Sequence, residues 1–83
     1  MKNIQLQQKI GEKIKQIREI KGITQQDLAA ACNFEKSNMS RIEAGKTNFT
    51  ISTLYKISMA LDVKLAELVD VLGQMPETSR WKR

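Results

Sequence analysis

The stretch TQQDLAAACNFEKSNMSRIEAG, residues 24–45, predicts two short helices joined by a tight turn. Thr24 belongs to the residue types that cap a helix N-terminus, and Asp27 follows three residues later as an imperfect capping box. Asn33 tolerates a positive φ better than most residues that carry a side chain, so it suits a sharp turn. The pattern indicates helices over 24–32 and 35–44, the second ended by Gly45.

Side-chain size in this pair of helices predicts which way the second helix faces. Ala29 is small enough to lie where two crossing helices approach closely, and Leu28 supplies an apolar contact beside it. Met39 and Ile42 are expected to pack inward from the second helix. Its polar side must then face outward, and this side carries residues spaced four apart: Lys36 with Ser40, and Ser37 with Arg41.

An apolar stripe predicts a longer helix at the start of the chain. The stripe consists of isoleucines at helical spacing, Ile10, Ile14, Ile17 and Ile20, and Gly22 follows it. Ile4 and Leu6 precede the stripe out of phase with it. We therefore expect this helix to span 7–21 and the residues before it to fray.

The whole chain is predicted to be all-α, because no segment shows a strand pattern. Thr50 or Ser52 begins a fourth helix, Asp62 closes it, and the segment KLAELVDVL forms a fifth. We predict a compact five-helix domain over 1–73, followed by a flexible basic tail over 74–83. The expected helices are 7–21, 24–32, 35–44, 51–61 and 64–72.

Composition excludes several classes of function. The 83 residues carry a net charge of +5, which is compatible with a polyanionic partner, but three of the cations lie among the last four residues. The chain has no histidine and one cysteine, so neither a zinc site nor an intramolecular disulfide is expected. We see no nucleophile–base pair and expect no cofactor, so an enzyme is not expected. No apolar run approaches the roughly 20 residues that span a bilayer, and the N-terminus lacks a signal-peptide pattern. We expect a cytoplasmic protein.

The segment TQQDLAAACNFEKSNMSRIEAGKTNFTISTLYKISMALDVKLAEL resembles the Cro/C1-type helix-turn-helix family of phage repressors and their bacterial relatives. The resemblance extends from Ile10 to about Leu68, and restriction–modification controller proteins are close relatives. Asn33 replaces the usual turn glycine, and Phe49 stands where proline is common. The resemblance implies the lambda-repressor-like five-helix fold.

The resemblance also implies roles for several polar residues of the helix pair and of the loop that follows it. The helix over 35–44 would enter the major groove of double-stranded DNA, with Lys36, Ser37, Ser40 and Arg41 at the base edges. The DNA backbone would contact Gln25, Asn38, Lys46, Thr47 and Asn48. For all of these residues the alternative is an ordinary solvated surface.

Two charged residues and the cysteine have structural roles in this interpretation. The resemblance pairs Arg18 with Glu43 in a largely buried ion pair, which keeps the carboxylate away from phosphate. Cys32 occupies a position usually taken by a core residue, so we interpret it as a small buried hydrophobe rather than a redox sensor.

Helix 64–72 carries more apolar residues than so small a core readily hides. Leu65, Leu68, Val69 and Leu72 are candidates for a homodimer interface, and packing against the first helix is the alternative. A dimer would place its two recognition helices about 34 Å apart, which matches half-sites one DNA turn apart.

The resulting hypothesis is a small dimeric transcriptional regulator, bacterial or phage-encoded and associated with the nucleoid, that represses at a palindromic operator. One alternative is a restriction–modification controller, which can also activate transcription. Another is an antitoxin-like protein that binds a protein partner through helix five or through the tail, where the role of Trp81 stays open.

Overall fold

The computed structural model of the chain describes residues 3–70, which fold into five helices without a strand. The all-α prediction is confirmed. The helices are α1 (Asn3–Ile20), α2 (Gln25–Ala31), α3 (Lys36–Glu43), α4 (Ile51–Leu61) and α5 (Leu65–Val69).

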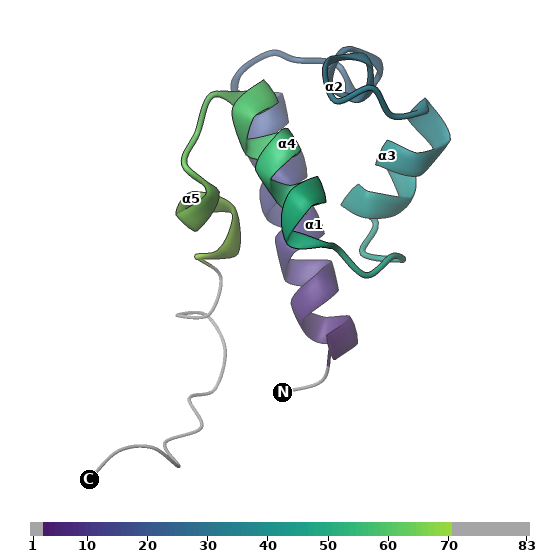
Figure 1. The fold of residues 1–83 in the computed structure, drawn as a ribbon, viewed down its shortest axis with the longest axis vertical. Helices are drawn as coiled ribbons and strands as arrows, with labels where there is room; N and C mark the ends of the chain where they lie inside the picture. The colour runs from purple at the N-terminus through teal and green to yellow at the C-terminus, as the bar shows by residue number, and fades with distance from the viewer. Residues whose placement is uncertain (1–2, 71–83) are drawn as a thin grey trace, which may run out of the picture.

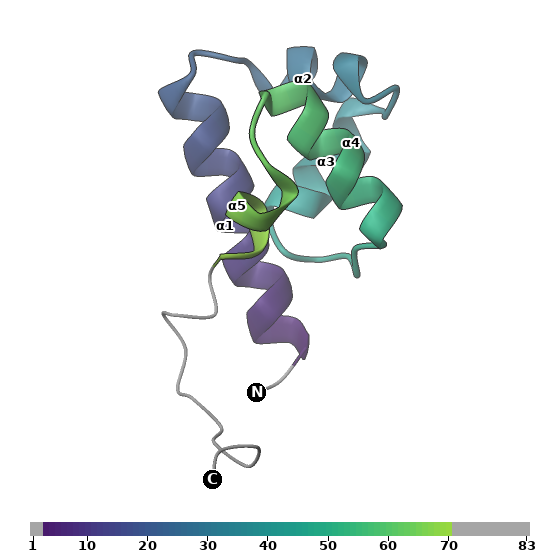
Figure 2. The ribbon, with the colours of Figure 1, turned by 60° about the vertical axis from the view of Figure 1, so that its left-hand side comes forward.

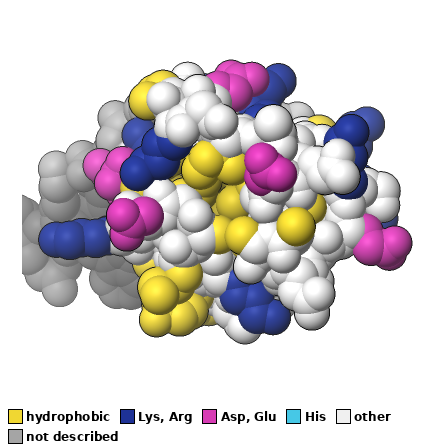
Figure 3. All heavy atoms as spheres, turned by 90° about the horizontal axis from the view of Figure 1, so that it is seen from above, with side chains coloured by type: hydrophobic (Ala, Val, Ile, Leu, Met, Phe, Trp, Pro, Cys, Tyr) yellow, Lys and Arg dark blue, Asp and Glu magenta, His cyan; other side chains and the backbone are white. Residues whose placement is uncertain are grey.

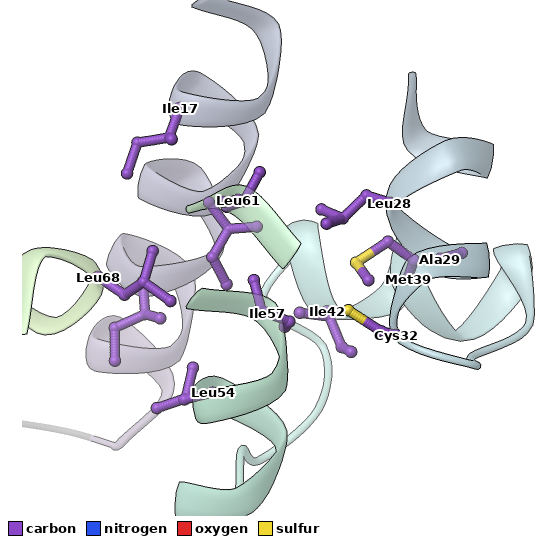
Figure 4. Close-up of a cluster of buried hydrophobic side chains, with 12 residues drawn as sticks. Ile17, Leu28, Ala29, Cys32, Met39, Ile42, Leu54, Ile57, Leu61 and Leu68 are labelled. Carbon is purple, nitrogen blue, oxygen red and sulfur yellow. The ribbon is translucent and has the colours of Figure 1, made fainter. Parts of the chain in front are cut away.

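The long helix α1 is the centre of the arrangement. Figure 1 shows α4 in front of α1, with α2 and α3 to one side of this pair and α5 to the other. Figure 2 shows α5 lying against α1. The apolar side chains of all five helices meet between them, and Figure 4 shows the labelled part of this core. The buried apolar residues are Ile10, Ile14, Ile17, Leu28, Ala29, Cys32, Met39, Ile42, Leu54, Ile57, Leu61 and Leu68.

Helix α1 differs from its prediction at both ends. It begins at Asn3 rather than at residue 7. Leu6 is half-buried against the core four residues before Ile10, so it lies in phase with the stripe and extends the helix. At the other end Ile20, predicted to face inward, is 84% exposed because the core ends at Ile17.

The predicted caps and turns are confirmed. The Thr24 hydroxyl accepts a hydrogen bond from the Asp27 backbone N–H at 3.0 Å. The hydroxyl of Thr50, rather than that of Ser52, does the same for Thr53 at 3.0 Å. Asn33 makes the turn between α2 and α3 with φ 60°, and a second left-handed residue, Asp62, ends α4 with φ 58°.

Two glycines, Gly11 within α1 and Gly45 directly after α3, allow α1 and α3 to approach each other closely. A Cβ on Gly11 would lie 2.6 Å from the backbone oxygen of Ile42, so only glycine fits at this crossing. Gly45 follows α3 with φ 73°, and a Cβ there would lie 2.6 Å from the Cα of Gln8. The close approach at Gly11 depends on a tertiary contact and was not part of the sequence prediction.

The last predicted helix is shorter in the structure. Helix α5 spans Leu65–Val69 rather than 64–72, and Leu72 and the predicted tail over 74–83 lie outside the described residues.

Candidate functional site

Helix α3 has one buried side and one exposed side. Met39, Ile42 and Glu43 are buried, whereas the four predicted base-contact residues are all exposed: Lys36, Ser37, Ser40 and Arg41. Met39 and Ile42 pack into the same core as Leu28 of α2 (Figure 4). The buried side therefore fixes the direction in which the exposed hydroxyl, ammonium and guanidinium groups point.

The charge on this exposed side is positive and unneutralised. Lys36, Arg41 and Lys46 form no ion pair with any residue in the described part of the chain, 3–70. The backbone N–H of Lys46 donates to the carbonyl oxygen of Arg41 at 2.9 Å, so the loop after α3 begins beside the end of that helix. These groups can donate hydrogen bonds to an anionic or carbonyl-rich partner.

The other predicted backbone-contact residues lie on α3 and in the loop that follows it. Asn38 and Asn48 are exposed, and Thr47 is half-buried. Together with Lys46 they extend the polar surface beyond α3 toward the start of α4.

A buried ion pair connects the site to α1. Arg18 Nε donates to Glu43 Oε2 at 2.7 Å and Arg18 Nη2 donates to Glu43 Oε1 at 3.2 Å, and both residues are buried. The third nitrogen of Arg18, Nη1, donates to the carbonyl oxygen of Ile23 at 2.9 Å. One guanidinium therefore links α1, the turn before α2 and the end of α3.

Gln25 joins the same network, a contact that sequence reasoning missed. Its amide nitrogen Nε2 donates to Glu43 Oε1 at 3.1 Å, and the side chain is half-buried. The carboxylate can only accept hydrogen bonds, so it favours the orientation in which the amide nitrogen faces it. That nitrogen carries two hydrogens, and one remains for a further acceptor. The spacing of 18 residues between Gln25 and Glu43 gives no local signal of this contact.

The dimer candidates on α5 do not all reach the surface. Leu68 is fully buried and belongs to the core, and Leu65 and Val69 are half-buried against it. Leu72 lies outside the described residues. Leu68, which was expected at a dimer interface, therefore packs inside the monomer.

Cys32 lies in the core. Burial raises the pKa of its thiol above the ordinary value, and the positive charge of Lys56 opposes this rise only in part. Within residues 3–70, no group of three side chains has the composition and placement to hold a metal ion. None of the helices described there is both long and apolar enough to cross a membrane.

The chain is similar in sequence to a known family and to its members. A family model described as helix-turn-helix matches residues 14–68. The uncharacterised HTH-type transcriptional regulator y4dJ of Sinorhizobium fredii is 34% identical over 71 residues, which are 86% of this chain and 92% of that protein.

Two solved structures share the fold. The restriction–modification controller protein C.AhdI from Aeromonas hydrophila has a TM-score of 0.71 at 30% identity, covering 74% of this chain and 92% of its own. The SinR protein/SinI protein complex has a TM-score of 0.72 at 37% identity, covering 84% of this chain and 69% of the matched chain.

Proposed function

The chain belongs to the helix-turn-helix family of transcriptional regulators, and we propose that it binds a specific double-stranded DNA sequence as a homodimer. The observation that carries the proposal is the exposed side of α3, whose direction is fixed by buried Met39 and Ile42 on the opposite side.

In the proposed complex α3 lies in the major groove. Arg41 and Lys36 would donate hydrogen bonds to guanine N7 and O6, the acceptors that distinguish this base in the major groove. The hydroxyls of Ser37 and Ser40 can donate or accept, so they adapt to more than one base. Sequence preference would come from these four residues.

Contacts to phosphate would hold α3 in register on the duplex. The free hydrogen of Gln25 Nε2, beside the N-terminus of α2, is one donor for a phosphate oxygen. Asn38, Lys46, Thr47 and Asn48 are the other donors in the proposal. Such contacts carry no sequence information, but they contribute affinity and salt dependence.

A two-fold homodimer would recognise a palindrome, since its two α3 helices would meet identical half-sites about 34 Å apart. We propose repression at such an operator, in a bacterial cytoplasm at the nucleoid. The similarity to C.AhdI favours a controller role as a second candidate. The SinR/SinI complex favours an additional protein partner.

Selection of bound duplexes from a random pool with the full chain tests the proposal. We expect enrichment of an inverted repeat with half-sites one helical turn apart, with binding that weakens steeply as salt rises because phosphate contacts release counterions. An unenriched pool, or binding that does not change with salt, would refute specific DNA binding.

A further inference from the structure

Glu35 stands directly before α3 and brings a carboxylate to a surface whose other exposed charges are positive. On the end of the molecule shown in Figure 3, acidic and basic side chains are interspersed. On α3 and in the loop after it, by contrast, the exposed charges are those of Lys36, Arg41 and Lys46. The other acidic residue of this segment, Glu43, is buried in an ion pair. Glu35, which is exposed, is therefore the acidic group that a partner bound to α3 meets.

The fold gives this carboxylate no partner. Glu35 is the N-cap of α3, but its side chain makes no capping hydrogen bond, and it forms no ion pair with any residue between 3 and 70. The same chain caps α2 and α4 with Thr24 and Thr50, whose hydroxyls each accept a backbone hydrogen bond.

The length of the Glu35 side chain has no explanation in the helix itself. Ser, Thr, Asp and Asn cap a helix well because a short side chain reaches the first free backbone N–H groups. A negative charge at a helix N-terminus is favourable, but aspartate would supply both the charge and the cap. A residue that departs from a local rule without a structural gain is typical of a functional position.

The backbone of Glu35 is held in place beside the base-contact residues. Its carbonyl oxygen accepts a hydrogen bond from the backbone N–H of Met39 at 3.1 Å, and Met39 is fully buried. Lys36 and Ser37 follow Glu35 directly in the chain. The N-terminal residues of a helix in the major groove are the ones that reach base edges, so Glu35 lies within the part of the surface that reads DNA in the proposed complex.

We propose that Glu35 reads a cytosine, its carboxylate accepting a hydrogen bond from the cytosine N4 amino group. The inference rests on the proposed function and deepens it by adding a specificity-determining residue of opposite charge. In the major groove cytosine presents only the N4 donor, whereas guanine presents the acceptors N7 and O6 and thymine the acceptor O4. Adenine places an N7 acceptor beside its N6 donor. A carboxylate only accepts hydrogen bonds, so it matches cytosine best.

The charge of Glu35 also acts against other sequences. Phosphates repel a carboxylate, and at a site without the cytosine this carboxylate loses water without gaining a hydrogen bond. Glu35 thus lowers the affinity for incorrect sequences more than for the correct one, which is one way in which a binder becomes specific. Because Glu35 and Lys36 are neighbours, we expect the cytosine to be paired with, or next to, the guanine that Lys36 contacts.

Selection from a random duplex pool with three forms of the full chain tests the inference: the wild type, Glu35→Gln and Glu12→Gln. Glu12→Gln makes the same chemical change at an exposed residue of α1 and is the matched control. We expect the wild-type and control pools to carry a C·G pair at one fixed position of each half-site. Glu35→Gln should select adenine in place of this cytosine, since an amide both donates and accepts and matches adenine N7 and N6. The rest of the site should stay the same.

Titrations of defined duplexes measure the size of the effect. The wild type should bind the selected duplex at least about fivefold more tightly than a duplex in which adenine replaces the cytosine, and Glu35→Gln should reverse this preference. Glu35→Gln should also bind a scrambled duplex more tightly than the wild type does, because the substitution removes a charge that phosphate repels.

A second variant, Glu35→Ser, separates DNA reading from stability. Serine can cap α3, so the Tm of this variant in a melt followed by circular dichroism should rise, while its preference for the cytosine should be lost. A serine variant with a lower Tm and an unchanged preference would assign Glu35 to the fold and overturn the inference.

The outcomes of the pool selection also separate this inference from the proposed function. A wild-type site in which every base pair is retained by Glu35→Gln overturns the inference, while specific DNA binding by α3 stands. A wild-type pool that enriches nothing refutes specific DNA binding and the inference with it.

Discussion

Glu43 shows how a residue that lies beside the proposed DNA surface can serve the fold instead. Its carboxylate is buried and accepts hydrogen bonds from Arg18 and Gln25 at 2.7–3.2 Å. The guanidinium of Arg18 therefore balances the negative charge of Glu43 inside the fold. Removal of one partner from such a network leaves the other charge buried without compensation.

Glu43→Ala is therefore expected to destabilise the fold by about 3–5 kcal/mol. A thermal melt followed by circular dichroism measures the loss as a lower Tm. Glu12→Ala, on the exposed surface of α1, is the control and should leave the Tm nearly unchanged. Equal Tm values for Glu43→Ala and the wild type would show that the ion pair contributes nothing to stability.

The burial of the Cys32 thiol leads to a second prediction for a single residue. Because burial raises its thiol pKa, the folded protein keeps the thiol protonated at a pH where an exposed cysteine already forms thiolate. Alkylation followed by mass spectrometry should be slow in the folded protein and fast in denaturant. The difference should persist as the pH rises through the ordinary thiol pKa. Equal rates in both states would place Cys32 at the surface.

At the scale of the elements, local chemistry explains what the sequence could predict. Thr24, Asn33, Thr50 and Asp62 act through backbone hydrogen bonds or φ angles within a few residues of themselves, so the turns and helix starts they set were predictable. The start of α1 was predicted wrongly, because Leu6 was assigned out of phase although it lies four residues before Ile10 and packs against the core. The contact of Gly11 with α3 was missed because it depends on a tertiary approach that no local pattern shows.

Gln25, the first residue of α2, leads to a prediction about DNA affinity. Gln25→Ala should weaken binding to all duplexes about equally and lower the salt slope by roughly one phosphate contact, because in the proposed complex the amide donates to phosphate and contacts no base. Gln26→Ala changes the neighbouring, exposed glutamine and is the control. Titrations of a selected and a scrambled duplex at several salt concentrations measure both effects. A loss confined to the selected duplex would contradict the phosphate role.

At the scale of the whole molecule, the exposed side of α3 followed from the pattern of Met39 and Ile42, whereas the role of α5 did not follow from its apolar pattern. Leu68 of α5 fills the core of the monomer. An apolar helix pattern alone does not distinguish such core packing from a subunit interface.

The central claim is that the exposed side of α3 reads a DNA sequence. The most direct test is the ratio of affinities for the selected and a scrambled duplex, measured for Arg41→Ala and Lys36→Ala. Lys64→Ala is the control, since it removes the same charge from the start of α5, across the molecule from α3 (Figure 1). We predict that each α3 variant loses about 1–3 kcal/mol of binding to the selected duplex and relaxes the sequence preference, while the control keeps the wild-type ratio. Wild-type ratios in both α3 variants would contradict the claim.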